Sequence, residues 1–334
     1  MLVSRLRLGV QIAAFVLLVY AGLIGIRRIT IAEREPSFPT LSCEYGRPVA
    51  KCFLYDLQYL LTNDAAGRYR RLVEPVLFFL GFGLLLGRRW CGWLCPVGLL
   101  QDLATKARAK LGRRPLRLGP RARHGLYWTA VGLLVVTILL SAVIGWPSSR
   151  LYPYKLALLR PYCQLCPGKQ VFPLLTGNVG GFLNLDTLNG TALVMSVLGI
   201  AVFLVFLVGI FPIRRFWCRI CAMGLLMRLV GLNRWSLINL RKDTRRCTRC
   251  GNCARVCPVD IQEVYLQRER ADVSPTDCHL CLKCVEACPE AHVLSGRLLK
   301  WPFFSSSFEY GGPARGADPE SEGTDLGIRP CSGV

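Results

Sequence analysis

Two short runs of cysteine decide how the C-terminal part of this chain folds: CTRCGNCARVCP at residues 247–258 and CHLCLKCVEACP at residues 278–289. In each run the cysteines follow the spacing C-x2-C-x2-C-x3-C-P, which is typical of sequences that hold two [4Fe-4S] clusters. Three cysteines of a run bind one cluster, and the fourth binds the other cluster. The sequence therefore predicts one cluster on Cys247, Cys250, Cys253 and Cys288 and another on Cys257, Cys278, Cys281 and Cys284.

A zinc module with C-x2-C pairs, or a set of structural disulfides, is the other interpretation of such cysteines. Two complete copies of the run, each ending in a proline (Pro258 and Pro289), favour the clusters. We therefore expect residues 247–300 to form a small α+β domain of the bacterial 2[4Fe-4S] ferredoxin type. Residues 301–334 are rich in glycine, serine and acidic side chains, and we expect them to be a disordered tail.

The chain before these runs is apolar enough to lie in a membrane. Hydrophobic residues make up 52% of the 334-residue sequence, and the mean hydropathy is +0.36. A helix needs about 20 residues to cross the hydrocarbon core of a bilayer. Four stretches approach or reach that length, at about residues 8–26, 72–87, 126–146 and 191–213. We expect residues 1–246 to form an all-α integral membrane four-helix bundle. The histidines lie outside the middle of these stretches, which excludes a bis-histidine haem inside the membrane.

The formal net charge of +21 is unevenly spread along the chain. Basic residues predominate up to Arg246 and are densest in residues 88–123 and 214–246. Because basic loops gather on the cytoplasmic side of a membrane, we expect both termini and the ferredoxin domain in the cytoplasm, beneath a bacterial inner membrane. The basic excess then faces anionic lipid. Membrane lipid, and no nucleic acid, is the expected partner.

The apolar part contains one internal repeat. RRWC at residues 88–91, followed by CPVGLL at 95–100, resembles RRFWC at 214–218, followed by CAMGLL at 221–226. Each copy directly follows the second helix of a pair. We therefore expect two helix pairs of like direction, related by an axis along the membrane normal.

If the two copies face each other, the repeat brings four thiols together at the cytoplasmic edge of the bundle: Cys91, Cys95, Cys218 and Cys221. Four such thiols could hold a further iron–sulfur cluster, and neighbouring arginines would offset its negative charge. These arginines are Arg88, Arg89, Arg214 and Arg215. Ordinary buried cysteines without a metal are the other interpretation.

A second set of cysteines lies in the loops that the sequence places on the opposite side: Cys43, Cys52, Cys163 and Cys166. Cys163 and Cys166 stand in CQLCP, which has the spacing of a metal-ligand or redox pair. Cys43 and Cys52 are further apart and match no tight motif. A second four-cysteine metal site and a disulfide on an oxidising face both remain open.

The arrangement as a whole resembles the NapH-type membrane ferredoxins, a group with MauN-like methylamine-utilisation ferredoxins and, more distantly, NosR-type regulators. The resemblance spans about residues 1–300 and rests on Cys91, Cys95, Pro96 and the two C-terminal runs. It implies quinol oxidation or related electron transfer, as a subunit of quinol dehydrogenase type that serves a periplasmic reductase or dehydrogenase. The family pattern has a second Cys-x3-Cys-Pro. This chain has CRICA at residues 218–222, which is one residue shorter and lacks the proline.

The expected function is that of an integral membrane iron–sulfur protein without catalytic side chains. It passes single electrons between the quinol pool and a periplasmic or cytoplasmic redox partner, through two [4Fe-4S] clusters and one or two further clusters in the membrane domain. The alternative is a transmembrane thiol relay that exchanges disulfides and supports maturation of a periplasmic metalloenzyme. A passive membrane anchor for a soluble ferredoxin is a third possibility, which the repeat around the inner cysteines disfavours.

Overall fold

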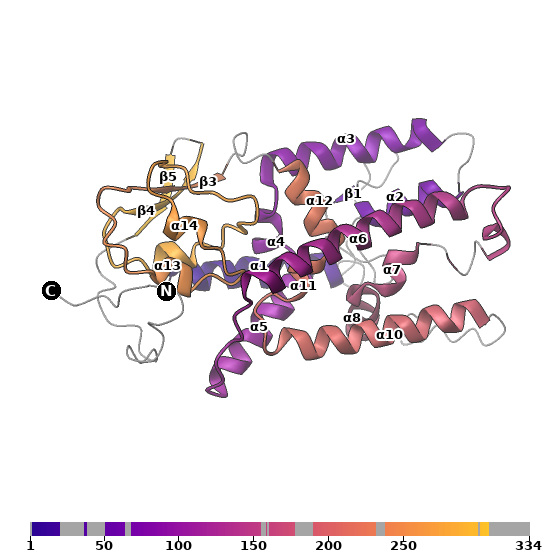
Figure 1. Ribbon diagram of the computed structural model, residues 1–334, viewed down its shortest axis with the longest axis horizontal. Helices are drawn as coiled ribbons and strands as arrows, with labels where there is room; N and C mark the ends of the chain where they lie inside the picture. The colour runs from indigo at the N-terminus through magenta and orange to yellow at the C-terminus, as the bar shows by residue number, and fades with distance from the viewer. Residues whose placement is uncertain are drawn as a thin grey trace.

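The computed structural model shows a long helical part joined to a small lobe that contains a three-stranded sheet (Figure 1). It describes residues 2–20, 37–38, 51–63, 68–154, 158, 160–177, 190–231, 238–299 and 301–306. The lobe, coloured orange to yellow, lies at one end of the molecule, and the longest helices run along the molecule's long axis away from it. The mostly helical fold with a small ferredoxin-like lobe agrees with the expected fold class.

Three helices are long and apolar enough to cross a membrane: α1 (Leu2–Tyr20), α6 (Pro120–Ile144) and α10 (Gly190–Ile210). The prediction of four spans is thus confirmed for three of them among the described residues. The remaining one, α3 (Arg68–Leu86), has a shorter apolar part, Leu72–Leu86, because arginines fill its first turn. Residues 21–26, expected at the end of the first span, lie outside the described residues.

Short helices between the spans fold back against the long ones. α2 (Phe53–Asn63) packs on α3 and α6, while α7 (Pro161–Leu165) and α8 (Pro167–Leu175) pack on α10. Figure 1 shows α7 and α8 between α6 and α10, short of the far end of both helices. These segments therefore lie within the helical part. Smaller elements are a parallel pair, β1 (Ser37–Phe38) and β2 (Lys51–Cys52), and a 3-10 turn, η1 (Tyr152–Tyr154).

Each copy of the internal repeat forms two helices with a break at its second cysteine. The first copy gives α4 (Arg89–Trp93) and α5 (Pro96–Lys110), and the second gives α11 (Trp217–Ile220) and α12 (Ala222–Val230). The residues around α12 belong to the same buried core as residues from α2, α3, α4, α6 and α7. That core holds Phe53, Phe79, Trp90, Leu134, Tyr162, Ala222 and Met223. The repeat is therefore part of the packed centre of the helical part.

The lobe is built on an antiparallel sheet of order β3-β4-β5. Its strands are β3 (Ile238–Lys242), β4 (Leu294–Leu298) and β5 (Trp301–Ser305), and its short helices are α13 (Asn252–Arg255), α14 (Glu263–Leu266) and α15 (Lys283–Glu286). The sheet extends beyond both ends of the expected segment 247–300. Residues 301–305, expected in a disordered tail, form β5 because Ser295 and Gly296 of β4 pair with it. Residues 307–334 lie outside the described residues.

The first turn of α1 belongs to the lobe and ties it to the helical part. Val3 is buried in the core of the lobe, together with Leu280 and Leu282. The Ser4 backbone N–H donates to Glu286 Oε1 at 3.1 Å. Further along, α1 packs against α4 and α5. The two parts of the protein therefore share a helix as well as the chain that joins them.

Candidate functional site

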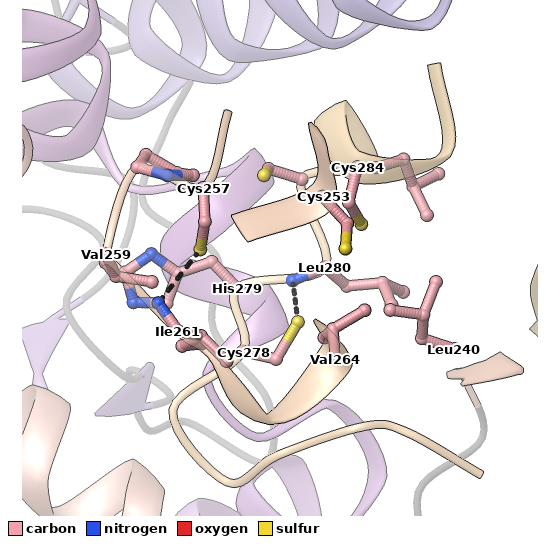
Figure 2. Close-up of a pocket in the computed structure, with 13 residues that line it drawn as sticks. Leu240, Cys253, Cys257, Val259, Ile261, Val264, Cys278, His279, Leu280 and Cys284 are labelled. Carbon is pink, nitrogen blue, oxygen red and sulfur yellow. Dashed lines mark hydrogen bonds between the residues drawn. The ribbon is translucent and has the colours of Figure 1, made fainter. Parts of the chain in front are cut away.

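Two cavities in the lobe are lined by the cysteines of the two C-terminal runs. We call them site I, lined by Cys247, Cys250, Cys253 and Cys288, and site II, lined by Cys257, Cys278, Cys281 and Cys284. Cys253 also lines site II (Figure 2), so the two cavities share a residue. Each site takes its fourth cysteine from the other run. The structure therefore places the cysteines of each predicted quartet around one cavity.

The loops around the sites turn sharply because several residues adopt left-handed backbone conformations. Gly251 has φ +75, and the leucines of the second run, Leu280 and Leu282, have φ +44 and +57. Such conformations cost a non-glycine residue roughly 1–3 kcal/mol. Both leucines are buried in the core of the lobe, and this packing offsets the strain.

Backbone N–H groups point at the sulfur atoms as a result of these turns. The Ile261 N–H donates to Cys257 Sγ at 3.3 Å, and the Leu280 N–H donates to Cys278 Sγ at 3.3 Å (Figure 2). Hydrogen bonds to the sulfurs are among the factors that set the reduction potential of an iron–sulfur cluster. The two bonds therefore act on the chemistry of site II as well as on its shape.

Burial favours the protonated thiol at three cysteines of the lobe. Burial raises the pKa of Cys253 to about 11, of Cys257 to about 12 and of Cys278 to about 11. Iron binds the thiolate, so cluster assembly releases these protons. Among the described residues, no three His, Cys, Asp or Glu side chains surround one point closely enough to hold a single ion. Four soft thiols around a cavity fit a [4Fe-4S] cluster, in which each cysteine binds a different iron.

The inner cysteines of the repeat lie in one neighbourhood of the helical part. Cys95 and Cys221 precede α5 and α12 with nearly equal backbone angles, φ −68 and ψ 121 against φ −68 and ψ 119. Cys91 lies close enough to Cys95, Cys218 and Cys221 for a thiolate charge on any of the three to act on it. We call this quartet the inner site.

The missing proline of the second copy has a structural reason. Ala222, which stands where the first copy has Pro96, is fully buried, and its N–H donates to Tyr162 Oη at 3.3 Å. A proline has no N–H and would lose this bond. Tyr162 Oη also lies 3.6 Å from Cys221 Sγ. The departure from the family pattern therefore keeps a backbone N–H that bonds a tyrosine beside the inner site.

The second set of cysteines lies next to the inner site, although the sequence placed it across the membrane. Cys163 is in α7, and Cys166 precedes α8 with φ −70 and ψ 130, which is the same local geometry as Cys95 and Cys221. Cys166 is close enough to Cys221, Cys163 and Cys52 for their charges to interact. Cys43 lies outside the described residues. We call Cys52, Cys163 and Cys166 the outer set.

Sequence reasoning missed the side chains that hydrogen-bond these sulfurs. Gln101 Nε2 lies 3.4 Å from Cys218 Sγ, and Gln58 Nε2 lies 3.3 Å from Cys163 Sγ. Both amides are completely buried. The signal that could have found them is an amide that directly follows leucine, in Leu57-Gln58 and in Leu100-Gln101, because a buried amide needs partners.

Comparison with known proteins agrees with this geometry. Residues 75–115 and 195–242, which hold the two copies of the repeat, match the 4Fe-4S binding domain, and residues 239–289 match the 4Fe-4S dicluster domain. The chain is 31% identical over 254 residues to YccM of Escherichia coli, covering 74% of this chain and 62% of YccM. It is 25% identical over 247 residues to the ferredoxin-type protein NapH of Haemophilus influenzae, covering 72% of this chain and 70% of NapH. The chain belongs to the NapH-type family of membrane ferredoxins.

Other relatives of this membrane ferredoxin match shorter stretches. The methylamine utilization ferredoxin-type protein MauN of Methylorubrum extorquens is 30% identical over 188 residues, which cover 54% of this chain and 50% of MauN. This chain therefore spans less than two thirds of both YccM and MauN. No solved structure matches it.

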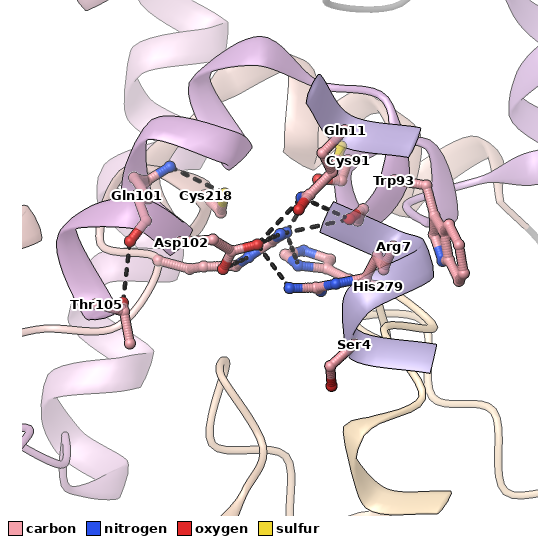
Figure 3. A network of polar contacts seen from close by, with 12 residues as sticks. Ser4, Arg7, Gln11, Cys91, Trp93, Gln101, Asp102, Thr105, Cys218 and His279 are labelled. Carbon is pink, nitrogen blue, oxygen red and sulfur yellow. Dashed lines mark hydrogen bonds and ion pairs between the residues drawn. The ribbon is translucent and has the colours of Figure 1, made fainter. Parts of the chain in front are cut away.

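A buried ionic network joins the inner site of this ferredoxin to α1 and α5 (Figure 3). Asp102 Oδ2 accepts from Arg7 Nη2 at 2.7 Å, from Arg215 Nη2 at 2.6 Å and from Gln11 Nε2 at 3.1 Å. Burial alone would raise the pKa of Asp102, but Arg215 and Arg7 hold it well below its ordinary value. The carboxylate therefore stays ionised and compensates charge that would otherwise be buried alone.

The helical part and the lobe touch at a glycine that has no room for a side chain. A Cβ on Gly92 would lie 2.1 Å from the backbone oxygen of His279. We expect Gly92→Ala to destabilise the contact between the two parts by about 1–3 kcal/mol, as overpacking does. Thermal unfolding of the purified protein measures the effect. Gly132→Ala in α6, where nothing lies within 4 Å, is the matched control and should be neutral or slightly stabilising. Equal unfolding temperatures of the two variants would contradict the close contact.

Proposed function

We propose that the protein carries electrons between the quinol pool and a redox partner protein, through two [4Fe-4S] clusters in the lobe and a further cluster at the inner site. The observation that carries this proposal is the direct contact between the inner site and site II. Trp93, two residues after Cys91, donates from Nε1 to the Leu280 carbonyl at 2.9 Å, and Gly92 touches His279. Both partners lie between Cys278 and Cys281 of site II.

The cysteine sites form a continuous series through the protein. Cys253 lines both sites in the lobe, the Gly92 and Trp93 contacts join site II to the inner site, and Tyr162 lies between the inner site and the outer set. The clusters supply one-electron carriers when bound. The chain's own residues hold them in sequence, exclude water and provide the hydrogen bonds to sulfur described above. No nucleophile or general base is needed for this function.

The orientation and the partners belong to the proposal. Basic residues are dense between α3 and α6 and again after α10, on the side of the helical part where the lobe lies. The distribution of basic loops supports a cytoplasmic lobe beneath a bacterial inner membrane. Quinol would then be oxidised in the membrane, and the partner would be a periplasmic or cytoplasmic redox protein.

One observation favours the alternative of a thiol relay. Cys163 and Cys166 have the C-x2-C spacing of redox pairs, with Cys166 at the start of a helix, and they adjoin the inner site. A relay would pass electron pairs by thiol–disulfide exchange along these cysteines. Trapping of thiols in cells separates the two functions. Thiols that cycle between reduced and disulfide forms favour the relay, and thiols that bound iron protects favour the cluster.

Iron content tests the proposed function. Anaerobically purified protein should hold the roughly eight irons of two ferredoxin clusters and additional iron at the inner site. Cys91→Ser combined with Cys218→Ser should remove the additional iron and leave the ferredoxin signals in electron paramagnetic resonance unchanged. Cys331→Ser, outside both sequence runs and the repeat, is the control. Equal iron content in the double variant and the control would rule out a cluster at the inner site.

A further inference from the structure

Two arginines stand at equivalent positions of the repeat, and the side chain of each reaches the backbone of the other copy. Arg88 and Arg215 each stand three residues before the first cysteine of their own copy. Arg88 Nη2 donates to the carbonyl oxygen of Cys218 at 2.5 Å, and Arg215 Nη1 donates to the carbonyl oxygen of Cys91 at 2.9 Å. Each arginine therefore binds the backbone of the opposite half. The other arginines that the sequence singled out, Arg89 and Arg214, bind the carbonyls of Leu86 and Arg255 instead.

The same two guanidinium groups also bind the segment of the lobe that carries Cys278. Arg88 Nη1 lies 2.5 Å from Asp277 Oδ1, and Arg215 Nη1 lies 3.0 Å from His279 Nδ1. Asp277 and His279 flank Cys278, a cysteine of site II. Because a guanidinium group only donates hydrogen bonds, His279 Nδ1 accepts and the ring carries its proton on Nε2. Each arginine thus connects the inner site with site II.

A glycine at the same position of each copy lies beside these crossings. A Cβ on Gly98 would lie 2.9 Å from the Cys91 carbonyl oxygen and 3.7 Å from Arg215 Nη2. A Cβ on the equivalent Gly224 would lie 3.5 Å from the Cys218 carbonyl oxygen and 3.5 Å from Arg88 Nη2. The glycine that both copies share therefore faces the arginine of the opposite half. This agreement extends the repeat from the cysteines to the residues that surround them.

The charges of the two arginines act on both sites at once. Arg215 is completely buried, and its charge interacts with Cys218 of the inner site and Cys281 of site II. Arg88 is 9% exposed, and its charge acts on Cys91 and on Cys278. Screening by water and salt is weak for buried charges. Arg88 and Arg215 therefore each place a positive charge between the inner site and site II.

We propose that Arg88 and Arg215 form a crossed clasp, a pair of positioning residues that joins the inner site to site II and raises the reduction potential of the centre at site II. Each arginine shares its carboxylate with a second arginine, Arg215 sharing Asp102 with Arg7 and Arg88 sharing Asp277 with Arg228, so each group keeps a net positive charge. An electron that arrives at site II adds a negative charge beside these groups, which stabilise the reduced form. The hydrogen bonds of the clasp also fix the separation between the two sites. The coupling between sites rests on the proposed function, whereas the effect on site II does not require a cluster at the inner site.

Redox titration of the full-length protein, followed by electron paramagnetic resonance, tests the clasp. Arg215→Gln and Arg88→Gln should each lower the equilibrium constant for reduction of site II at least tenfold, a shift of about 59 mV for one electron. Arg215→Lys and Arg88→Lys keep the charge and should restore most of the potential. Arg123→Gln is the matched control, because Arg123 also joins the helical part to the lobe, through the Asp260 carbonyl at 2.8 Å.

A second variant and a measurement of iron content separate a failure to fold from a failure of the proposal. Arg215→Gln leaves Asp102 buried with one arginine fewer, so this variant is the one that could fail to fold. Arg88→Gln leaves the partly exposed Asp277 still paired with Arg228 at 3.1 Å, and it tests the same clasp. A site II potential in both glutamine variants equal to that of Arg123→Gln would overturn the proposal. Iron content is measured in the same samples. Absence of inner-site iron in the wild type would remove that cluster, while a shifted site II potential would still support the clasp.

Discussion

Asp102→Asn is expected to cost about 3–5 kcal/mol of folding stability, because removal of one partner leaves buried charge uncompensated. Asp102 is 5% exposed, and its carboxylate bonds two arginines that are also buried, Arg7 and Arg215. Asparagine keeps the size of the side chain and can still accept a hydrogen bond, but it carries no charge. Because total stabilities are about 5–15 kcal/mol, we expect a severely lowered yield of folded protein.

Thermal unfolding in detergent, with retention of the lobe's iron, measures this loss. The control is Asp243→Asn, whose carboxylate is 42% exposed and lies 3.7 Å from Arg246; exposed pairs contribute only about 0–1 kcal/mol. The folded-state pKa of Asp102 lies below its ordinary value of about 3.9. Its contribution is therefore complete above that pH and is lost only as the pH falls through the lower, folded-state value. A stability difference between wild type and Asp102→Asn that vanishes at pH 7 would contradict this account.

Cys281→Ser is expected to stop electron passage between the helical part and the lobe. Site II adjoins both site I and the inner site, so electrons in the proposed series pass through it. Mutation of a residue that only supports a metal ligand lowers metal affinity or activity by about 10–100-fold. Loss of a ligand should therefore lower the rate of electron transfer from quinol to site I by at least about 100-fold.

Cys250→Ser provides the matched comparison, because it removes a proposed ligand of site I, on the far side of site II. Its site II should still be reduced by quinol at the wild-type rate, whereas Cys281→Ser should leave site I oxidised. Freeze-quenched electron paramagnetic resonance after addition of quinol follows the two signals separately. Reduction of site I at an undiminished rate in Cys281→Ser would show that electrons enter the lobe by another route.

Much of the candidate site could be predicted because its ligands are close in sequence. The quartets of sites I and II follow from two contiguous runs, and the convergence of the inner cysteines follows from the repeat. The long apolar helices α1, α6 and α10 were predictable for the same reason, since each is a continuous local pattern. The ends of the lobe were less predictable, because β3 and β5 are short strands that become recognisable only when they pair with β4.

The position of the outer set could not be read from the chain. Whether the segment with Cys163 and Cys166 stays outside the bundle or folds back into it depends on packing against α6 and α10, which are distant in sequence. The roles of Tyr162, Gln58 and Gln101 depend on the same long-range packing. A polar side chain in an apolar stretch shows that a partner is needed, but it does not show which partner.

By itself, the sequence determined which cysteines group together within each run, which stretches are apolar helices and that the membrane part contains a repeat, because these features depend on neighbouring residues. Only the tertiary structure decided that the outer set adjoins the inner site and that Asp102 compensates Arg7 and Arg215. It also decided that Arg88 and Arg215 cross to the opposite halves. The physical reason is that buried charges and buried amides take whichever partners the packed helices bring within hydrogen-bonding distance, and that choice is made between residues far apart in the chain.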